Sequence, residues 1–505
     1  MSTTERIVEG VAARVQAHQA ELRKEMGLVD VVLAQIAYII TLEFFGTAVK
    51  AGSSHAFLWL AAVFLFFIPQ ALVVRYLNQL MPLEGGLYEW ARLAFNDATG
   101  FLVAWNLWLY ILLLVAEYGF VIVTYVAFAL GPGAAWMASS KWLTVFASAV
   151  LVGGLVLVST LGLRVGKWVT NTGGSLTIVA LGVLVVLPVF HPMRDTLLSY
   201  HPLPLARPAL SLFSLSVFTK MTFGALCGFE FVAIFAGECR NPARTLARSV
   251  LFAAPVIAVL YIFGTSAILA YVPSSQVNLI GPVPQALSVG LHASGLANIL
   301  APVTILLLLG NVLSTANLTF SASSRLPMVA GWDDLLPRWF TRLHPQHKTP
   351  TNSILFIASV TFAASVVVLI GVNEEEAFSL IQIWAFTLYG LAYMVMFAIP
   401  LAAHRKLGVL PHIRVRLAAC SGFTVTLLFV VLAIFPVIDV PNPASYAWKT
   451  VALVLGVNIL GAICMRDARR DLNVPGTLSS CELDHEQTGN KSTTEKPGWE
   501  GSLDS

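Results

Sequence analysis

The chain has 505 residues, of which 57% are hydrophobic and only 11% are charged, with a formal net charge of +3. A soluble domain carries about 25% charged residues, so this composition excludes a soluble domain and indicates an integral membrane protein. The five cysteines are scattered, without a CxxC pair or a histidine at metal-ligand spacing. Neither a disulfide framework nor a zinc site is therefore expected.

Apolar stretches recur along the chain, each long enough to cross a hydrocarbon core of roughly 30 Å with about 20 helical residues. The alternating pattern of a membrane barrel is absent, and backbone groups in lipid must bond internally, so the spans are helices. The sequence predicts an all-α membrane protein with about twelve spans. They lie near residues 28–50, 56–80, 100–130, 142–162, 168–190, 212–236, 246–272, 294–322, 352–371, 377–402, 415–437 and 446–465.

Polar segments are predicted at both ends of this transmembrane domain, which covers residues 27–466. Residues 1–26 are charged and contain no short apolar region with a cleavage site, which favours a cytoplasmic tail over a signal peptide. Residues 467–505 are polar and poor in aromatic side chains, which is typical of a disordered tail.

The distribution of Lys and Arg predicts the orientation in the membrane. With both termini cytoplasmic, 24 of the 30 basic residues lie in or beside cytoplasmic segments, in agreement with the positive-inside rule. The sequence therefore predicts a multi-pass protein of the plasma or inner membrane with both termini inside. The six basic residues on the other side are Lys50, Lys141, Arg194, Arg207, Lys220 and Lys449.

Residues 218–248 contain the strongest signal for a functional site. Gly224 and Gly228 lie four residues apart in an apolar span, and Glu230 follows two residues later. A glycine costs a helix about 1 kcal/mol, and a carboxylate at mid-membrane costs about 2.5 to 3.5 kcal/mol, so such residues are usually retained for packing or function. The plainer alternatives are close helix packing at the glycines and an ion-paired carboxylate at Glu230.

A second signal lies between the second and third spans, in residues 77–110. Pro82 and the pair Gly85-Gly86 precede an amphipathic run that begins near Tyr88. This pattern predicts a tight re-entry followed by a short helix at the cytoplasmic interface.

Three motifs in order carry a family resemblance. They are P-x-x-G-G-x-Y at 82–88, G-F-E at 228–230 followed by E-x-x-N-P-x-R at 238–244, and a basic loop with L-P-x-x-F at 336–340. Together they resemble the permeases of the amino acid-polyamine-organocation superfamily, and the hydropathy extends the likeness over residues 28 to about 465.

The resemblance implies a five-plus-five inverted repeat, as in leucine-transporter-like folds, with repeat one at about 28–190, repeat two at about 212–402 and extra helices at about 415–465. Two broken helices would then expose backbone groups to substrate at mid-membrane. It places one break at 223–230 and the other near 37–40, where no glycine stands. Either other residues stabilise the first break, or the protein binds a substrate carboxylate differently from the family pattern.

Two further carboxylates, Glu43 and Glu117, lie inside predicted spans. Counted from Gly100, Glu117 falls where the third helix of the family passes the substrate, whereas Glu43 either lines the entrance or pairs with a lysine. Membrane carboxylates can compensate a cationic substrate or take up a coupling proton. The predicted substrate-binding residues are Ala37, Tyr38, Ile39, Glu117, Tyr118, Phe223, Gly224, Gly228, Phe229 and Glu230, and the candidates for coupling are Glu43, Glu117, Glu230, Ser314 and Thr315.

Ser314 and Thr315 resemble a sodium site of distant relatives that share the fold, although such hydroxyls mostly bond to their own helix or a neighbour. The candidate sodium site and a proton therefore both stay open as the coupling ion.

The predicted function is secondary active transport of amino acids across the cell membrane by alternating access, coupled to protons in preference to sodium, or exchange. A carrier of polyamines or other organic cations is the alternative, and a channel or non-transporting sensor is the second. An enzyme is not expected, because the histidines at 55, 344 and 347 have no partners at ligand spacing. The predicted partners are the small-molecule substrate and the lipid bilayer, with no cofactor and no nucleic acid.

Overall fold

The computed structural model describes residues 27–81, 86–161, 163–189, 200–230, 242–292, 297–329 and 351–472. These residues form helices and connecting turns, with no strand among them. Residues 82–85, 231–241 and 330–350, which hold much of the three motifs, lie outside the described residues. The same holds for the predicted terminal tails, except for the last turn of the final helix.

The described helices follow the predicted spans closely. In chain order they are α2 (Leu28–Ile39), α3 (Phe44–Val49), α4 (His55–Ala62), α5 (Ile68–Leu80), α6 (Leu87–Ala94), α7 (Asp97–Leu130), α8 (Lys141–Leu161), α9 (Leu163–Val186), α10 (Leu212–Leu226), α11 (Pro242–Tyr271), α12 (Pro282–His292), α13 (Ala297–Val329), α15 (Thr351–Val367), α16 (Glu374–Ala402), α17 (His404–Leu407), α18 (Ile413–Leu432) and α19 (Pro443–Leu472). A π-helical turn, Val63–Phe67, joins α4 to α5, and two short 3-10 helices, Gly52–Ser54 and Pro132–Ser139, precede α4 and α8.

Eight helices in the described part of the chain are long and apolar enough to cross a membrane. They coincide with eight of the predicted spans. The predicted spans at 28–50, 168–190, 212–236 and 352–371 correspond to shorter or interrupted apolar helices in the described residues. The chain is thus a multi-pass helical protein, while the number of twelve spans and the inverted repeat remain predictions.

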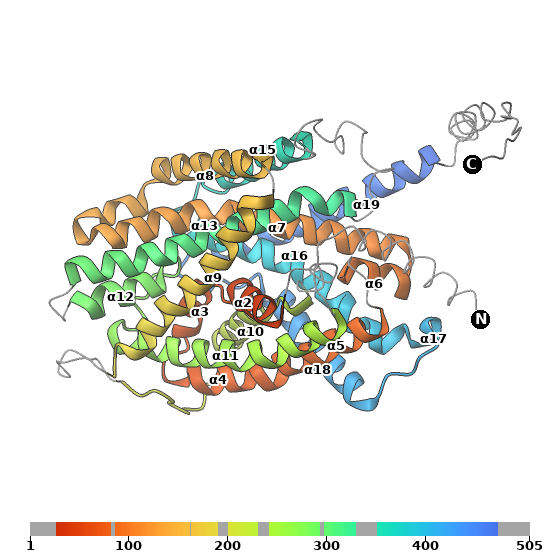
Figure 1. Ribbon diagram of the computed structural model, residues 1–505, viewed down its shortest axis with the longest axis horizontal. Coiled ribbons are helices and arrows are strands. Elements are labelled where there is room, and N and C mark those ends of the chain that lie inside the picture. Colours follow the sequence, from red (N-terminus) through yellow and green to blue (C-terminus); the bar gives the residue numbers. More distant parts are fainter. Residues whose placement is uncertain are drawn as a thin grey trace, which may run out of the picture.

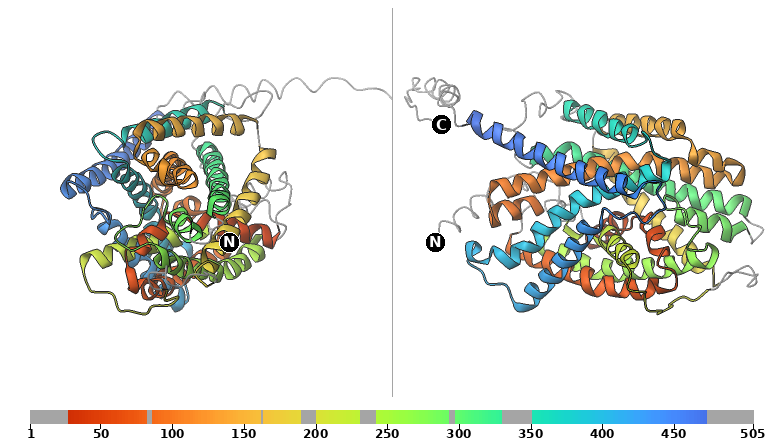
Figure 2. Two further views of the ribbon diagram at one scale, coloured as in Figure 1. Left: turned by 90° about the vertical axis from the view of Figure 1, so that its left-hand side faces the viewer. Right: turned by 180° about the vertical axis from the view of Figure 1, so that it is seen from behind.

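The long helix α7 is at the centre of the bundle. It packs extensively against α16 and α13, and the shorter elements α2, α3 and α10 lie in the middle of the molecule (Figures 1 and 2). The outer helices expose apolar side chains, such as Trp142 on α8 and Ile459 on α19, which are 85% and 59% exposed. An apolar exterior of this kind suits a surface that faces lipid.

The short helix predicted after the glycine pair is present as α6. Gly86 has φ of +52°, a backbone conformation that glycine adopts at little cost, and it immediately precedes the helix. Trp90 is buried, and its indole nitrogen donates to the carbonyl of Met81 (2.9 Å), so a hydrogen bond links α6 to the end of α5.

The π-helical turn has a local cause in Pro69, at the start of α5. Proline has no N–H to donate to the carbonyl four residues earlier, that of Leu65. The hydroxyl of Ser421, on α18, donates to this carbonyl instead (2.6 Å). The interruption is thus compensated by a bond between two helices.

Candidate functional site

The first predicted span is broken into α2 and α3. The backbone leaves the helical conformation at Ile40 (φ −75°, ψ 91°), and α3 begins at Phe44. The predicted break near 37–40 therefore lies about three residues too early, because residues 37–39 are still helical. Tyr38 and Ile39 nevertheless lie next to the break, at the end of α2.

A tyrosine on another helix stabilises this break. The backbone nitrogen of Thr41 donates to the hydroxyl of Tyr261 on α11 (3.0 Å), and that hydroxyl lies 3.1 Å from the carbonyl oxygen of Ile39. The nitrogen of Thr41 also donates to the carbonyl of Ile39 (2.9 Å), so the phenol adds a second partner to both groups at the interruption. This explains how the chain opens the helix without a glycine, and why the break falls after Ile39.

The second break begins where α10 ends at Leu226, inside the predicted segment 223–230. Cys227 is extended, and Gly228 has φ of +122°, which only glycine adopts without strain. A Cβ atom on Gly228 would lie 3.0 Å from the ring of Tyr38. The two interrupted helices therefore meet, with backbone against side chain, at Gly228 and Tyr38.

Gly224 has a different role. A Cβ atom at this position would overlap the ring of Phe44 on α3, at 2.0 Å. Gly224 therefore permits α10 to approach α3 closely, while the departure from helical geometry occurs at Gly228. Close helix packing, the plainer alternative, therefore accounts for Gly224. The break is located at Gly228.

Two side chains bind the free backbone groups of the α10 break. The nitrogen of Gly228 donates to the hydroxyl of Tyr393 on α16 (2.7 Å). Gln70, on α5, satisfies both ends of its amide when its nitrogen donates to the carbonyl of Leu226 (2.8 Å) and its oxygen accepts from Gly228 (3.2 Å). The break is thus fixed from α5 and α16, which are far from it in the sequence.

Glu230 is buried beside this break, and its carboxylate is held by two phenols. Tyr389 donates to one oxygen and Tyr393 to the other. These tyrosines lie four residues apart and hence on one face of α16. In the described part of the chain no basic residue pairs with Glu230, so the ion-pair alternative finds no support there.

Aromatic contacts link Glu230 to the first break. The ring of Tyr389 stacks on that of Tyr110 on α7, with centroids 4.2 Å apart and an interplanar angle of 9°. The hydroxyl of Tyr110 lies 3.5 Å from that of Tyr38, at the end of α2. Four tyrosines, at 38, 110, 389 and 393, therefore form a continuous layer across the two breaks.

Glu43 lines a cavity beside the same layer, and Glu117 is buried near Glu43 without lining that cavity. Glu43 occupies the N-cap position of α3 and lines a cavity of about 30 Å³ between the first break, α7 and α13. Glu117 is completely buried, neither of its oxygens has a hydrogen-bond partner, and it is close enough to Glu43 for the two charges to repel each other. The cavity is lined by Tyr38, Ile40, Thr41, Leu42, Glu43, Tyr110, Leu114, Tyr118, Asn311, Val312 and Thr315.

The alternative that Glu43 pairs with a lysine is not supported. Lys220 instead donates to the carbonyl of Phe435, and neither it nor Lys50 forms an ion pair with Glu43. The cavity, by contrast, brings together Glu43, Tyr118 and Thr315, three of the residues predicted to bind substrate or to couple transport.

The rings of Phe223 and Phe229 pack against aromatic rings of other helical segments. The ring of Phe223 stacks on Phe429 of α18 at 4.6 Å, and that of Phe229 stacks on Phe67 of the π-helical turn at 4.7 Å. Both are buried in the bundle and contact other helices there.

Sequence reasoning missed Gln70, Tyr110, Tyr261, Tyr389 and Tyr393. A buried tyrosine is common in a membrane bundle, so none of these residues is informative alone. The signal available was the pair of tyrosines four residues apart in residues 377–402, since two hydroxyls on one face of an apolar helix require a partner.

The chain is similar to known permeases and transporters. Residues 26–464 match the family model described as "Amino acid permease". The chain is 23% identical to an uncharacterised transporter of Legionella pneumophila, over 74% of this chain and 80% of that protein. It is 25% identical to the branched-chain amino acid permease BcaP of Bacillus subtilis, over 72% and 81% of the two chains.

A further similar protein is a probable agmatine/putrescine antiporter, AguD, of Lactococcus lactis, at 23% identity over 58% of this chain and 62% of that protein. The family match covers most of the chain and confirms the resemblance based on the three motifs. The chain belongs to the amino acid permease family, a family of multi-pass membrane transporters within the amino acid-polyamine-organocation superfamily.

Proposed function

We propose that this protein is a secondary transporter that moves amino acids or related amines across the cell membrane by alternating access. The observation that carries the proposal is the meeting of two interrupted helices beside three buried carboxylates, Glu43, Glu117 and Glu230, which have no basic partner among the described residues. An interrupted helix offers free backbone groups to a substrate, and unpaired carboxylates attract an ammonium group.

The size of the central cavity supports a gated mechanism. At about 30 Å³ it holds about two water molecules, since about 10 to 15 Å³ is needed for one. An amino acid is larger, so its binding requires the lining to move. The breaks in α2–α3 and α10 are places where half-helices can tilt without loss of a continuous hydrogen-bond ladder.

A diamine or polyamine is the second candidate, and it is favoured by the position of Glu43. The positive end of a helix can receive a substrate carboxylate, but the N-cap residue of α3 is Glu43, whose own negative charge would oppose a second carboxylate there. Glu230 and the pair formed by Glu43 and Glu117 are also separated by the tyrosine layer. Two separate anionic positions suit a substrate with two ammonium groups.

The experiment is uptake into proteoliposomes that contain the purified protein. Labelled leucine, agmatine and putrescine are offered with an inward proton gradient, an inward sodium gradient, or unlabelled substrate inside. Accumulation above the external concentration supports a coupled carrier, and dependence on internal substrate identifies exchange. Movement only to equilibrium without saturation would instead indicate a channel, and absence of movement of every compound by folded protein would contradict the proposal.

The identity of the transported compound distinguishes the two candidates. Saturable uptake of leucine that is not inhibited by putrescine would favour the amino acid, and the reverse pattern would favour the diamine. The variant Glu230→Gln tests the site for both substrates, since it removes one charge and keeps the size of the side chain.

A further inference from the structure

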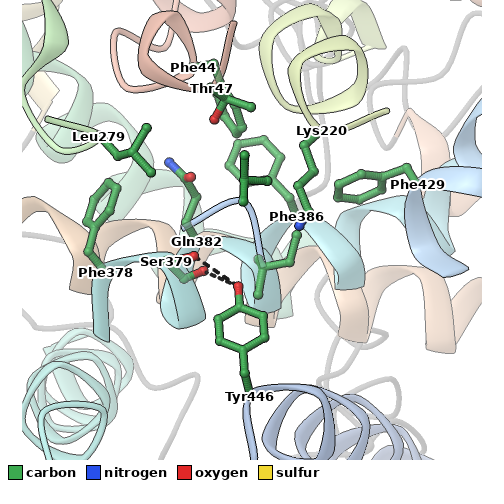
Figure 3. A pocket seen from close by; sticks show the side chains of 12 residues that line it. Phe44, Thr47, Lys220, Leu279, Phe378, Ser379, Gln382, Phe386, Phe429 and Tyr446 are labelled. Carbon is green, nitrogen blue, oxygen red and sulfur yellow. Dashed lines mark hydrogen bonds between the residues drawn. The ribbon is translucent and has the colours of Figure 1, made fainter. Parts of the chain in front are cut away.

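A second cavity lies at the end of the bundle where α16 and α19 begin, apart from the central site. It also measures about 30 Å³ and is formed by α3, α10, α16, α18 and α19, together with the segment between α18 and α19 and the segment before α12. Figure 3 shows the side chains that line it. They are Phe44, Thr47, Lys220, Leu279, Phe378, Ser379, Gln382, Ile383, Phe386, Phe429, Val437 and Tyr446.

Lys220 is the one charged residue in this lining. Its side chain comes from α10 and is only 5% exposed, and its ammonium group has one partner, the carbonyl of Phe435. An ammonium group has three N–H donors, and a buried cation without a counter-charge is costly. Among the described residues no carboxylate lies within ion-pair distance of Lys220; Glu376, at the start of α16, pairs with Lys449 (3.6 Å) instead.

Gln382 supplies a second donor without an acceptor. It lies on α16, and the nitrogen of its amide is buried without a hydrogen-bond partner among the residues that the structure describes. In Figure 3 this side chain rises from α16 towards Phe44 and Thr47. A buried amide N–H₂ that lacks an acceptor carries a desolvation penalty, so it marks a place where an acceptor is missing.

The other residues that line the cavity offer few free polar groups. Ser379 and Tyr446 bond to each other (3.0 Å), and most other members are aromatic or aliphatic. No acidic side chain lines the cavity. The site therefore offers an ammonium group and an amide N–H₂ within apolar walls, which is a suitable environment for a negatively charged acceptor and an unsuitable one for an amine.

We propose that this cavity binds one small monovalent anion, either a halide or the carboxylate group of a solute, through Lys220 and Gln382. Its volume matches such a group, since about 30 Å³ accommodates about two water molecules. The anion neutralises Lys220 and accepts from Gln382, and it joins α10 to α16. Because both helices also hold the central site, occupancy stabilises their packing there.

The test measures anion-dependent thermal stability of the purified full-length protein in detergent at constant pH and ionic strength. Sodium methanesulfonate, a monovalent salt with neither a halide nor a carboxylate, is the reference salt, and it is replaced stepwise by sodium chloride or by sodium acetate. We expect the unfolding temperature to rise and to saturate. The probe that saturates at the lower concentration identifies the source, an inorganic halide or a carboxylate.

Variants assign the effect to the cavity. Lys220→Met should raise the half-saturating anion concentration at least about tenfold, because a hydrogen bond to a charged group is lost. Lys449→Met, which removes a lysine that is paired with Glu376, is the matched control and should respond like the parent. Gln382→Glu should also lose the anion response, since it supplies a carboxylate within the cavity.

An anion response that is unchanged in both Lys220→Met and Gln382→Glu would overturn the proposal, as would a parent protein that responds to neither probe. If Lys220→Met fails to fold, Gln382→Glu and Lys449→Met alone decide the result. Because stability is the readout, the outcome does not depend on whether the proposed transport activity is found.

Discussion

The hydroxyl of Tyr261 accepts a hydrogen bond from the backbone nitrogen of Thr41 at 3.0 Å, and it lies close to two backbone carbonyls of the same interrupted segment. A side chain on α11 therefore fixes the position at which α2 ends. In a bilayer every free backbone group needs a partner inside the protein. The break between α2 and α3 is thus a property of two segments about 220 residues apart, and local sequence does not reveal it.

Tyr261→Phe tests this relationship. The substitution leaves the nitrogen of Thr41 without its phenol acceptor, and we expect a loss of stability of about 1 to 3 kcal/mol together with reduced substrate affinity. Tyr125→Phe is the matched control, because Tyr125 is buried on α7 and its hydroxyl has no partner. Equal unfolding curves for the two variants would show that the phenol does not hold the break.

Gly228→Ala should damage the second break. Gly228 has φ of +122°, and a Cβ atom would lie 3.0 Å from the ring of Tyr38, so alanine introduces strain of about 1 to 3 kcal/mol. Gly153→Ala on α8 is the control, since a Cβ atom there meets open space and alanine gains up to about 1 kcal/mol of helix propensity. The measurements are unfolding temperature and uptake, and uptake by Gly228→Ala at the parental rate would contradict the assignment.

The two phenols that bind Glu230 are expected to differ in importance. Tyr393 also accepts from the backbone of Gly228, whereas Tyr389 donates to the carboxylate and makes no bond to the backbone of the break among the described residues. Tyr393→Phe should therefore lower both stability and substrate affinity. Tyr389→Phe keeps its ring on Tyr110 and should mainly change affinity. Thermal unfolding and substrate titration of the two variants separate these effects, and the opposite order would refute the role of Tyr393 in the break.

The orientation in the membrane is a separate prediction. An epitope at Ser505 should be inaccessible to antibody on intact cells and accessible after permeabilisation, because most basic residues then lie on the cytoplasmic side. An epitope inserted at Arg207, in the exposed segment before α10, should react without permeabilisation and serves as the control. Reaction of the Ser505 epitope on intact cells would reverse the assignment.

The sequence is informative wherever a single residue type has a strong local meaning. Gly228 and Glu230 are unusual within an apolar span, and they indicate the second break and its carboxylate correctly. The partners of these residues are less visible, because Gln70 and Tyr393 lie about 160 residues away on either side and resemble ordinary core residues. The predicted first break is displaced for the same reason, since a distant phenol sets its position.

The roles of the buried carboxylates give the last prediction. Glu230 is bound by two phenols, whereas Glu117 has no hydrogen-bond partner and has Glu43 as a charged neighbour. If Glu117 takes up the coupling proton, Glu117→Gln should flatten the pH dependence of uptake and leave substrate exchange largely intact. If Glu230 binds the substrate amine, Glu230→Gln should weaken affinity strongly, because loss of one partner of a buried charge pair costs about 3 to 5 kcal/mol.

The two variants are compared by measuring substrate affinity and the pH profile of uptake separately. Glu376→Gln is the control, since Glu376 is a buried carboxylate on α16 that already pairs with Lys449 and lines neither cavity. One outcome is a pH profile that changes only in Glu117→Gln and an affinity that changes only in Glu230→Gln. That result would assign the proton to Glu117 and the substrate amine to Glu230 at the second break. If Glu117→Gln and Glu230→Gln both transport like the parent at every pH, the two carboxylates are structural and the central site assigned here is wrong.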